Sequence, residues 1–152
     1  MIASRYFDDF EVGSVFETAP VTLSEADIVS FAGQYDPQPM HTDPEAASHV
    51  TGGLIASGWH TASLSMKMLL TSGHYDPAPG SLGLGVEHLT WVRPVRPEDA
   101  IRLRIEIKSG RVTKSKQGFG ILTLHLTTLN QRDEIVQTMD TMALIPKRQL
   151  AA

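Results

Sequence analysis

An acid and an imidazole stand close together in the segment Asp36-Pro37-Gln38-Pro39-Met40-His41. The two prolines each fix a backbone angle, so they stiffen the chain between the two ionisable side chains. An aspartate is ordinarily ionised at neutral pH, and a histidine titrates close to it. Such a pair suits paired proton transfer, in which one group accepts a proton while the other donates one. The same two side chains would also suit a turn in which they only cap the backbone.

Reversible addition of water to a double bond conjugated with a thioester has three chemical requirements. It needs a base for the water, an acid for the α-carbon and hydrogen-bond donors for the enolate oxygen. Asp36 and His41 would supply the base and the acid. Gly58 would supply a donor through its backbone N–H, because it opens a long apolar helix and the N-terminus of a helix attracts negative charge.

Four further side chains flank these candidates. Tyr35 and Gln38 lie beside the acid and the imidazole, and Trp59 and His60 follow Gly58. We expect all four to line the pocket or its mouth. Core packing is an equally good prediction for Trp59, and a structural hydrogen bond is the better prediction for a lone histidine such as His60 on an apolar helix.

The composition of the chain excludes several other classes of site. There is no cysteine, which excludes disulfides, thiolate nucleophiles and cysteine-based zinc sites. The six histidines lack the short spacing of a metal-binding helix, so we expect no metal. No GxSxG, HExxH, Walker or GxGxxG motif is present. A formal net charge of −4 and a pI near 5.8 predict that nucleic acid is not a partner.

The distribution of apolar residues predicts no contact with a membrane. No apolar run approaches the roughly 18 residues that a membrane-spanning helix requires. Asp8 and Asp9 lie where a signal peptide would need an apolar core. We therefore expect a cytoplasmic protein that is not exported by that route.

Three helices are expected to position the candidate residues. The first spans residues 25–33, the second starts at Asp43-Pro44, and the third spans residues 59–71. Ser24 and Asp27 form a capping box at the start of the first helix. Residues 34–42, which hold the acid and the imidazole, are expected to form a loop. The third helix opens at Ser57-Gly58 and carries a single charge, so we expect it in the protein interior.

The second half of the chain changes to the alternation typical of strands. Apolar side chains at positions 101, 103, 105 and 107 alternate with charged ones. The expected strands span residues 14–21, 82–92, 101–108, 119–129 and 135–145. This order predicts one α+β domain, residues 1–152, in which an antiparallel β-sheet wraps around a long central helix. Because such a sheet has free edges, we expect a homodimer or a higher homo-oligomer.

Residues 31–47 resemble the signature of the MaoC-like dehydratases and (R)-specific enoyl-CoA hydratases, in which an aspartate and a histidine precede an alanine-rich helix. The resemblance extends to Tyr6–Gly13 at the start of the chain and to Val92–Asp99 between two strands. It implies the hot-dog fold, a site near a dimer interface, and catalytic roles for Asp36 and His41. It also implies an enoyl or hydroxyacyl thioester as substrate, with coenzyme A or an acyl carrier as part of it and no separate cofactor.

The chain departs from that signature at several positions. Tyr35 replaces a glycine and Gln38 replaces an asparagine. A serine that the family carries on the long helix aligns with Met66, and Ser63 and Ser65 lie nearby without an assigned role.

The leading hypothesis from the sequence is a hydro-lyase that acts on a 2-enoyl or 3-hydroxyacyl thioester. One alternative is a hot-dog thioesterase, which would need a carboxylate and a helix N-terminus but not the histidine. The other is an acyl-thioester-binding module without turnover. The acyl-chain length, the carrier and the physiological direction stay open.

Overall fold

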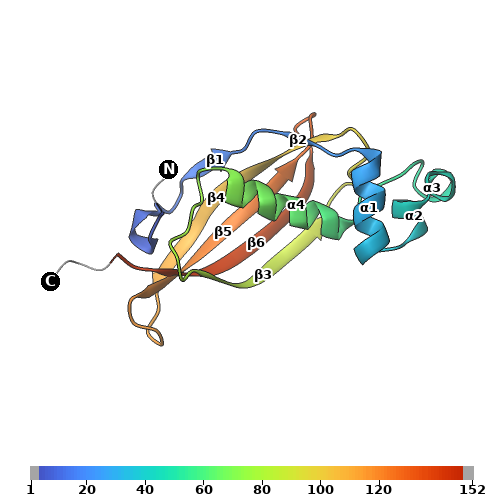
Figure 1. The fold of residues 1–152 in the computed structure, drawn as a ribbon. Helices are drawn as coiled ribbons and strands as arrows, with labels where there is room; N and C mark the ends of the chain where they lie inside the picture. The colour runs from blue at the N-terminus through green and yellow to red at the C-terminus, as the bar shows by residue number, and fades with distance from the viewer. Residues whose placement is uncertain (1–3, 149–152) are drawn as a thin grey trace.

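The computed structural model describes residues 4–148, and its body is an antiparallel sheet of six strands (Figure 1). The strand order is β1-β4-β5-β6-β3, and β2 also pairs with β4. The bounds are β1 Val15–Glu17, β2 Val21–Thr22, β3 Leu82–Trp91, β4 Ala100–Val112, β5 Phe119–Leu129 and β6 Ile135–Pro146. Strand β3 is therefore one edge of the sheet. The predicted domain, residues 1–152, extends beyond the described residues at both ends.

Four helices accompany the sheet: α1 Glu25–Tyr35, α2 Pro39–Thr42, α3 Pro44–Val50 and α4 Gly58–Thr71. Helix α4 runs across one face of the sheet, and the three shorter helices cluster near its N-terminal end (Figure 1). A 3₁₀ helix, Phe7–Asp9, was not expected from the sequence. In the described part of the chain no helix combines the length and the apolar character needed to cross a membrane.

The core lies between α4 and the inner face of the sheet. The alternating side chains of β4, Ile101 to Ile107, are fully buried, as are those of Leu122, Leu124 and Leu126 on β5. Met68 and Leu69 of α4 join the same cluster. Each such side chain contributes about 1.5–3 kcal/mol on burial. The α+β class and the hot-dog arrangement, a sheet wrapped around a long helix, are therefore confirmed.

The capping signals in the sequence are confirmed at two helices. The hydroxyl of Ser24 accepts the N–H of Asp27, and the Asp27 carboxylate accepts the backbone N–H of Ser24. At α3 the Asp43 carboxylate accepts the N–H groups of Glu45 and Ala46. Both helices therefore begin where the sequence places them.

Two expectations about local structure were wrong. The opening strand of residues 14–21 is two short strands, because Pro20 between them has no N–H to give to the ladder. The expected loop of residues 34–42 contains α2, which Pro39 begins with its fixed φ angle. The first helix is confirmed, and it ends at Tyr35, two residues beyond Gly33.

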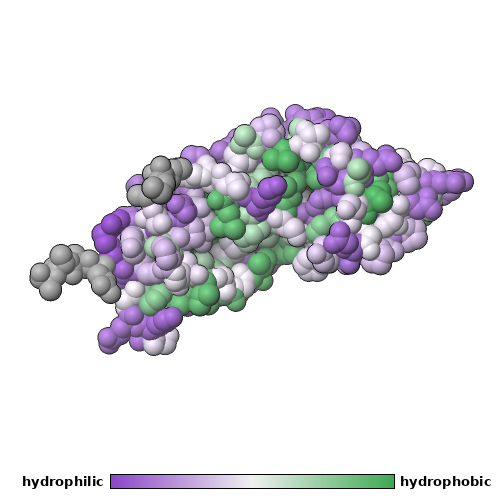
Figure 2. All heavy atoms as spheres, in the orientation of Figure 1, coloured by the Kyte–Doolittle hydropathy of each residue, from purple (hydrophilic) through white to green (hydrophobic). Residues whose placement is uncertain are grey.

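The expectation that α4 lies in the interior is correct for only one side of the helix. One side of the helix, with Thr61, Ser65, Met68 and Leu69, is buried. The opposite side leaves the apolar side chains of Trp59, Met66 and Leu70 exposed. Strand β3 beside it exposes Leu82, Leu84 and Val86. In Figure 2 hydrophobic residues gather along the middle of this face, over the region of α4 and β3, between more polar ends.

Candidate active site

Asp36 caps the C-terminal end of α1, and two side chains hold its carboxylate. The Ser57 hydroxyl donates to Oδ2 at 2.6 Å, and the Gln38 amide donates to Oδ1 at 2.7 Å. Hydrogen bonds to a carboxylate favour its charged form. The Ser57 bond first, and the Gln38 bond second, therefore lower the pKa of Asp36 below its ordinary value. Asp36 is ionised at neutral pH.

His41 lies on α2 with its side chain only 7% exposed. Its Nδ1 is 2.8 Å from the backbone carbonyl of Ile55. A carbonyl oxygen only accepts hydrogen bonds, so Nδ1 carries a hydrogen. The other ring nitrogen, Nε2, lies 3.5 Å from Oδ2 of Asp36. Any proton that His41 exchanges therefore enters or leaves at Nε2, the nitrogen that faces the acid.

Backbone hydrogen bonds fix the segment that joins the two side chains. The N–H of Gln38 donates to the carbonyl of Asp36 at 2.7 Å, and the N–H of His41 donates to the carbonyl of Gln38 at 2.9 Å. The N–H of Ile55 donates to the carbonyl of Met40 at 3.1 Å, which attaches the segment to the stretch just before α4. The acid and the imidazole are therefore held by turns and a short helix, not by prolines alone.

Ser57 and Gly58 bring the start of α4 to the same place. Ser57 is the N-cap residue: its hydroxyl accepts the N–H of Trp59 at 3.2 Å while it donates to Asp36. Gly58 follows as the first helical residue, and within the described residues its backbone N–H makes no hydrogen bond. A free N–H at the first turn of a fourteen-residue helix is a ready donor for an oxyanion.

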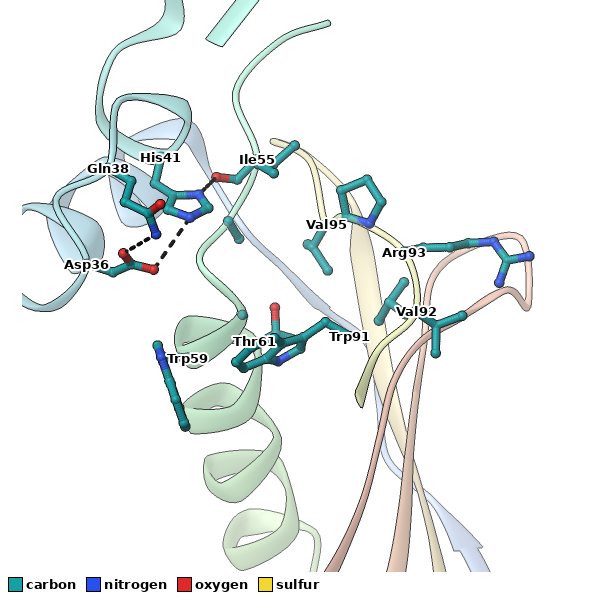
Figure 3. A pocket seen from close by; sticks show the side chains of 14 residues that line it. Asp36, Gln38, His41, Ile55, Trp59, Thr61, Trp91, Val92, Arg93 and Val95 are labelled. Atoms are coloured by element: carbon teal, nitrogen blue, oxygen red, sulfur yellow. Dashed lines mark hydrogen bonds and ion pairs between the residues drawn. The ribbon is translucent and has the colours of Figure 1, made fainter. Parts of the chain in front are cut away.

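Asp36, Gln38, His41 and Gly58 line one cavity of about 500 Å³ (Figure 3). Asp36, Gln38 and His41 form one side of it, and Gly58, Trp59 and Thr61 belong to it from α4. Residues 91–95, at the end of β3 and just beyond, form the opposite wall. The cavity thus combines an acid–base pair with an apolar wall, as a site for an acyl group requires.

The sequence predicts that Tyr35 and His60 line this pocket or its mouth, but neither residue lines it in the structure. They line a separate depression between α1 and α4. The His60 ring stacks on Phe31 with centroids 4.5 Å apart, and burial lowers its pKa. Tyr35 is 69% exposed, and its ring packs on Phe31 with centroids 5.0 Å apart instead of lining the cavity that holds Asp36.

The two serines without an assigned role have structural partners. Ser63 donates to the carbonyl of Trp59, and Ser65 donates to the carbonyl of Thr61. Met66 lies outside the cavity, in an apolar hollow beside β3.

Ser57 and Trp91 also belong to the site, but the sequence predicts only the start of a helix at Ser57 and a strand at Trp91. Ser57 contacts an acid that lies 21 positions earlier in the chain, and Trp91 packs against Gly58 from another element. No local pattern signals either contact. As for metals, residues 4–148 contain no group of three His, Asp or Glu side chains placed to hold one.

Comparison with known proteins identifies several relatives. The family model described as "MaoC like domain" matches residues 9–129. An uncharacterised protein of Bacillus subtilis, YdeM, is 36% identical over 141 residues, which are 92% of this chain and 98% of that protein. The crystal structure of a MaoC-like dehydratase from Rhodospirillum rubrum is 40% identical, has a TM-score of 0.89, and is matched over 97% of this chain and 100% of that one.

A more distant structural relative has a named activity. An (R)-hydratase from Pseudomonas aeruginosa, solved without ligand, superposes with a TM-score of 0.76 at 23% identity. The match covers 97% of this chain and 92% of the hydratase. At that identity the similarity establishes a shared fold.

Proposed function

This chain belongs to the family of the MaoC like domain, and we propose that it adds water to a 2-enoyl thioester or removes water from a 3-hydroxyacyl thioester. The observation that carries the proposal is the approach of His41 Nε2 to Asp36 Oδ2, 3.5 Å apart, at a cavity that also includes Gly58. An ionised acid, a protonatable imidazole and a free N–H are the three groups that this reaction requires.

In the hydration direction Asp36 is the proposed base and His41 the proposed acid. Water attacks C3 of the enoyl group, and its proton passes to the carboxylate of Asp36. Negative charge develops on the thioester oxygen, which accepts the N–H of Gly58. Protonated His41 then gives the proton on Nε2 to C2. A proton transfer from Asp36 back to Nε2 restores both groups, and dehydration is the reverse sequence.

The proposed reaction uses no metal and no separate cofactor. All three roles are assigned to this chain's own side chains and backbone, and the carrier, coenzyme A or an acyl carrier protein, arrives as part of the substrate. Arg93 at the cavity is the one lysine or arginine among the described residues that line it. A phosphate-bearing carrier would be attracted to that charge.

The assay for this proposal follows loss of the conjugated enoyl absorbance with a short enoyl-CoA. We expect turnover in the wild type and losses of at least about a hundredfold in Asp36→Asn and His41→Ala, because each removes one partner in proton transfer. Ser63→Ala is a matched control, since the only partner of that hydroxyl among the described residues is the backbone of its own helix.

The same incubation separates the alternative functions. Release of free thiol without hydration would identify a thioesterase, and saturable binding without either product would identify a binding module. An inactive wild type, or full activity in both Asp36→Asn and His41→Ala, would refute the hydro-lyase.

The proposal extends to assembly as a homodimer through α4 and β3. Strand β3 pairs with β6 on one side, and no strand of residues 4–148 pairs with its other side. Its apolar side chains continue the exposed apolar side of α4. A free strand edge beside an apolar face favours pairing with an identical edge, and a two-fold axis would join two sheets into one. The candidate site lies next to this face, because Trp59 and Trp91 contribute to both.

A further inference from the structure

A chain of hydrogen bonds leads from the cavity wall into the core. Trp91 faces Gln137 across the pairing of β3 with β6. Its indole N–H donates to the side-chain amide oxygen, Oε1, of Gln137 at 3.0 Å. The amide nitrogen of Gln137 donates to the Ser65 hydroxyl at 3.2 Å. Ser65 lies 2.8 Å from the Thr128 hydroxyl. The side chains that follow Trp91 in this network are all 0% exposed: Gln137, Ser65 and Thr128. Trp91 is therefore the member of the network that reaches the cavity.

The buried amide of Gln137 calls for an explanation beyond stability. An amide taken from water into an apolar interior is costly unless it is hydrogen-bonded, and an apolar residue of similar shape can be equally stable there. A buried polar network, in contrast, fixes one orientation of its members. The orientation that Gln137 fixes is that of the Trp91 ring, whose N–H edge is turned toward the core.

The ring held in this way lies against the start of α4. A Cβ atom added at Gly58 would lie 2.3 Å from Cε2 of Trp91, so only glycine permits the observed contact. The Trp59 ring meets the Trp91 ring edge-on, at 5.2 Å between centroids and an interplanar angle of 80°. The indole of Trp91 is thus held by Gly58, Trp59 and Gln137, and it contributes to the wall of the cavity.

We propose that Trp91 is the surface against which the acyl part of the thioester packs, and that Gln137 is a positioning residue that acts through the Trp91 ring. This inference rests on the proposed hydro-lyase function. A conjugated thioester is planar, so a flat ring beside the oxyanion donor favours a planar substrate by stacking. A branch on C4, the first saturated carbon of the enoyl chain, leaves this plane and meets a ring stacked on it, so the ring sets selectivity against substrates branched at C4.

Kinetics of single and double variants test this coupling. We expect Trp91→Phe and Gln137→Met each to lower kcat/KM for a straight-chain enoyl-CoA about tenfold, mainly through KM, because contacting residues couple strongly. The double variant should be no worse than Trp91→Phe alone, and Trp91→Ala should raise the ratio of kcat/KM for a 4-methyl-branched over a straight-chain substrate. Additive losses in the double variant, or an unchanged ratio in Trp91→Ala, would overturn the proposal.

A second readout needs no turnover. The chain contains only two tryptophans, so Trp59→Phe assigns the two indole N–H signals in an NMR spectrum. We expect the Trp91 N–H to exchange slowly with solvent in the wild type and at least about tenfold faster in Gln137→Met. Equal exchange in both proteins would refute positioning by Gln137. An inactive wild type would instead refute the proposed function, and the exchange measurement would still decide on Gln137.

Ile105→Val serves as the matched control for general loss of stability. Ile105 is fully buried on β4 and does not line the cavity. The variant should unfold at lower denaturant concentration while the indole exchange rate and the substrate ratio stay at wild-type values. If Ile105→Val also changed the indole exchange rate or the substrate ratio, the effects of Gln137→Met would be explained by lost stability alone, and the proposal would be contradicted.

Discussion

Asp36 owes its lowered pKa mainly to two neutral donors, Ser57 and Gln38. Because a hydrogen bond to the charged form lowers an acid's pKa, removing a donor must raise it. The carboxylate also stays oriented toward His41, since the Ser57 bond is made to the oxygen that faces Nε2. At the level of single residues, protonation and orientation of Asp36 are therefore controlled by the same contacts.

Ser57→Ala is expected to raise the pKa of Asp36 toward the ordinary aspartate value, and Gln38→Leu should do so to a smaller extent. Asp36 would then be deprotonated over a narrower range, and the acidic limb of kcat/KM would move to higher pH. A ¹³C NMR titration of the carboxyl group gives the pKa directly. Ser63→Ala should leave the titration unchanged, and an equal or lower pKa in Ser57→Ala would contradict this account.

Arg93 gives a second expectation at the residue scale. Its guanidinium donates only to the carbonyl of Ile135 among the described residues, so most of its donors are free at the cavity. We expect Arg93→Gln to raise KM for coenzyme A thioesters several-fold with little change in kcat, and salt to reduce the difference. Arg104→Gln, an exposed change on β4, is the control. A fall in kcat at constant KM would exclude a role in binding.

At the level of elements, the site is assembled from the ends of helices: the C-terminal end of α1, the short helix α2 and the first turn of α4. Capping signals predicted where α1 and α3 begin, because a cap depends on residues within one turn. Four-residue α2 escaped prediction, because it is too short for any periodic pattern. The exposed side of α4 could not be predicted either, because composition alone does not reveal which side of a helix packs on the sheet.

The capping box of α1 is expected to contribute stability without affecting chemistry. Ser24→Ala removes the acceptor for the N–H of Asp27 and should lower the free energy of unfolding by about 0.5–2 kcal/mol. Denaturant unfolding with kcat measured in parallel tests this expectation. A large loss of kcat would show that the N-terminal end of α1 influences Asp36 at its other end.

At the scale of the whole molecule, the alternating strands and the family signature predicted the architecture, and the signature together with the helix start predicted Asp36, His41 and Gly58 as candidates. Trp91 and Gln137 could not be predicted, because their importance comes from a contact between two strands and a helix start that only the folded chain brings together. Their residue types alone fit an ordinary strand.

The exposed face of α4 and β3 gives an expectation for assembly. We expect the wild type to sediment as a dimer and Leu84→Lys to shift it toward monomer, because a charge on a buried apolar interface is costly. Val112→Lys, a change at a comparably exposed valine near the far end of β4, is the matched control. A monomeric wild type at micromolar concentration would contradict the proposed assembly.

The double use of the Ser57 hydroxyl limits how this site can change during evolution. One hydroxyl both caps the N-terminus of α4 and donates to Asp36. A substitution at Ser57 that changes the pKa of Asp36 therefore also removes the cap of a helix that packs on the core. Adaptation to a new substrate is therefore easier at Trp91 or Arg93, which line the cavity without starting a helix, than at Ser57. Among natural variants of this chain, divergence should concentrate on the wall and rim of the cavity while position 57 keeps a small side chain that can both donate and accept.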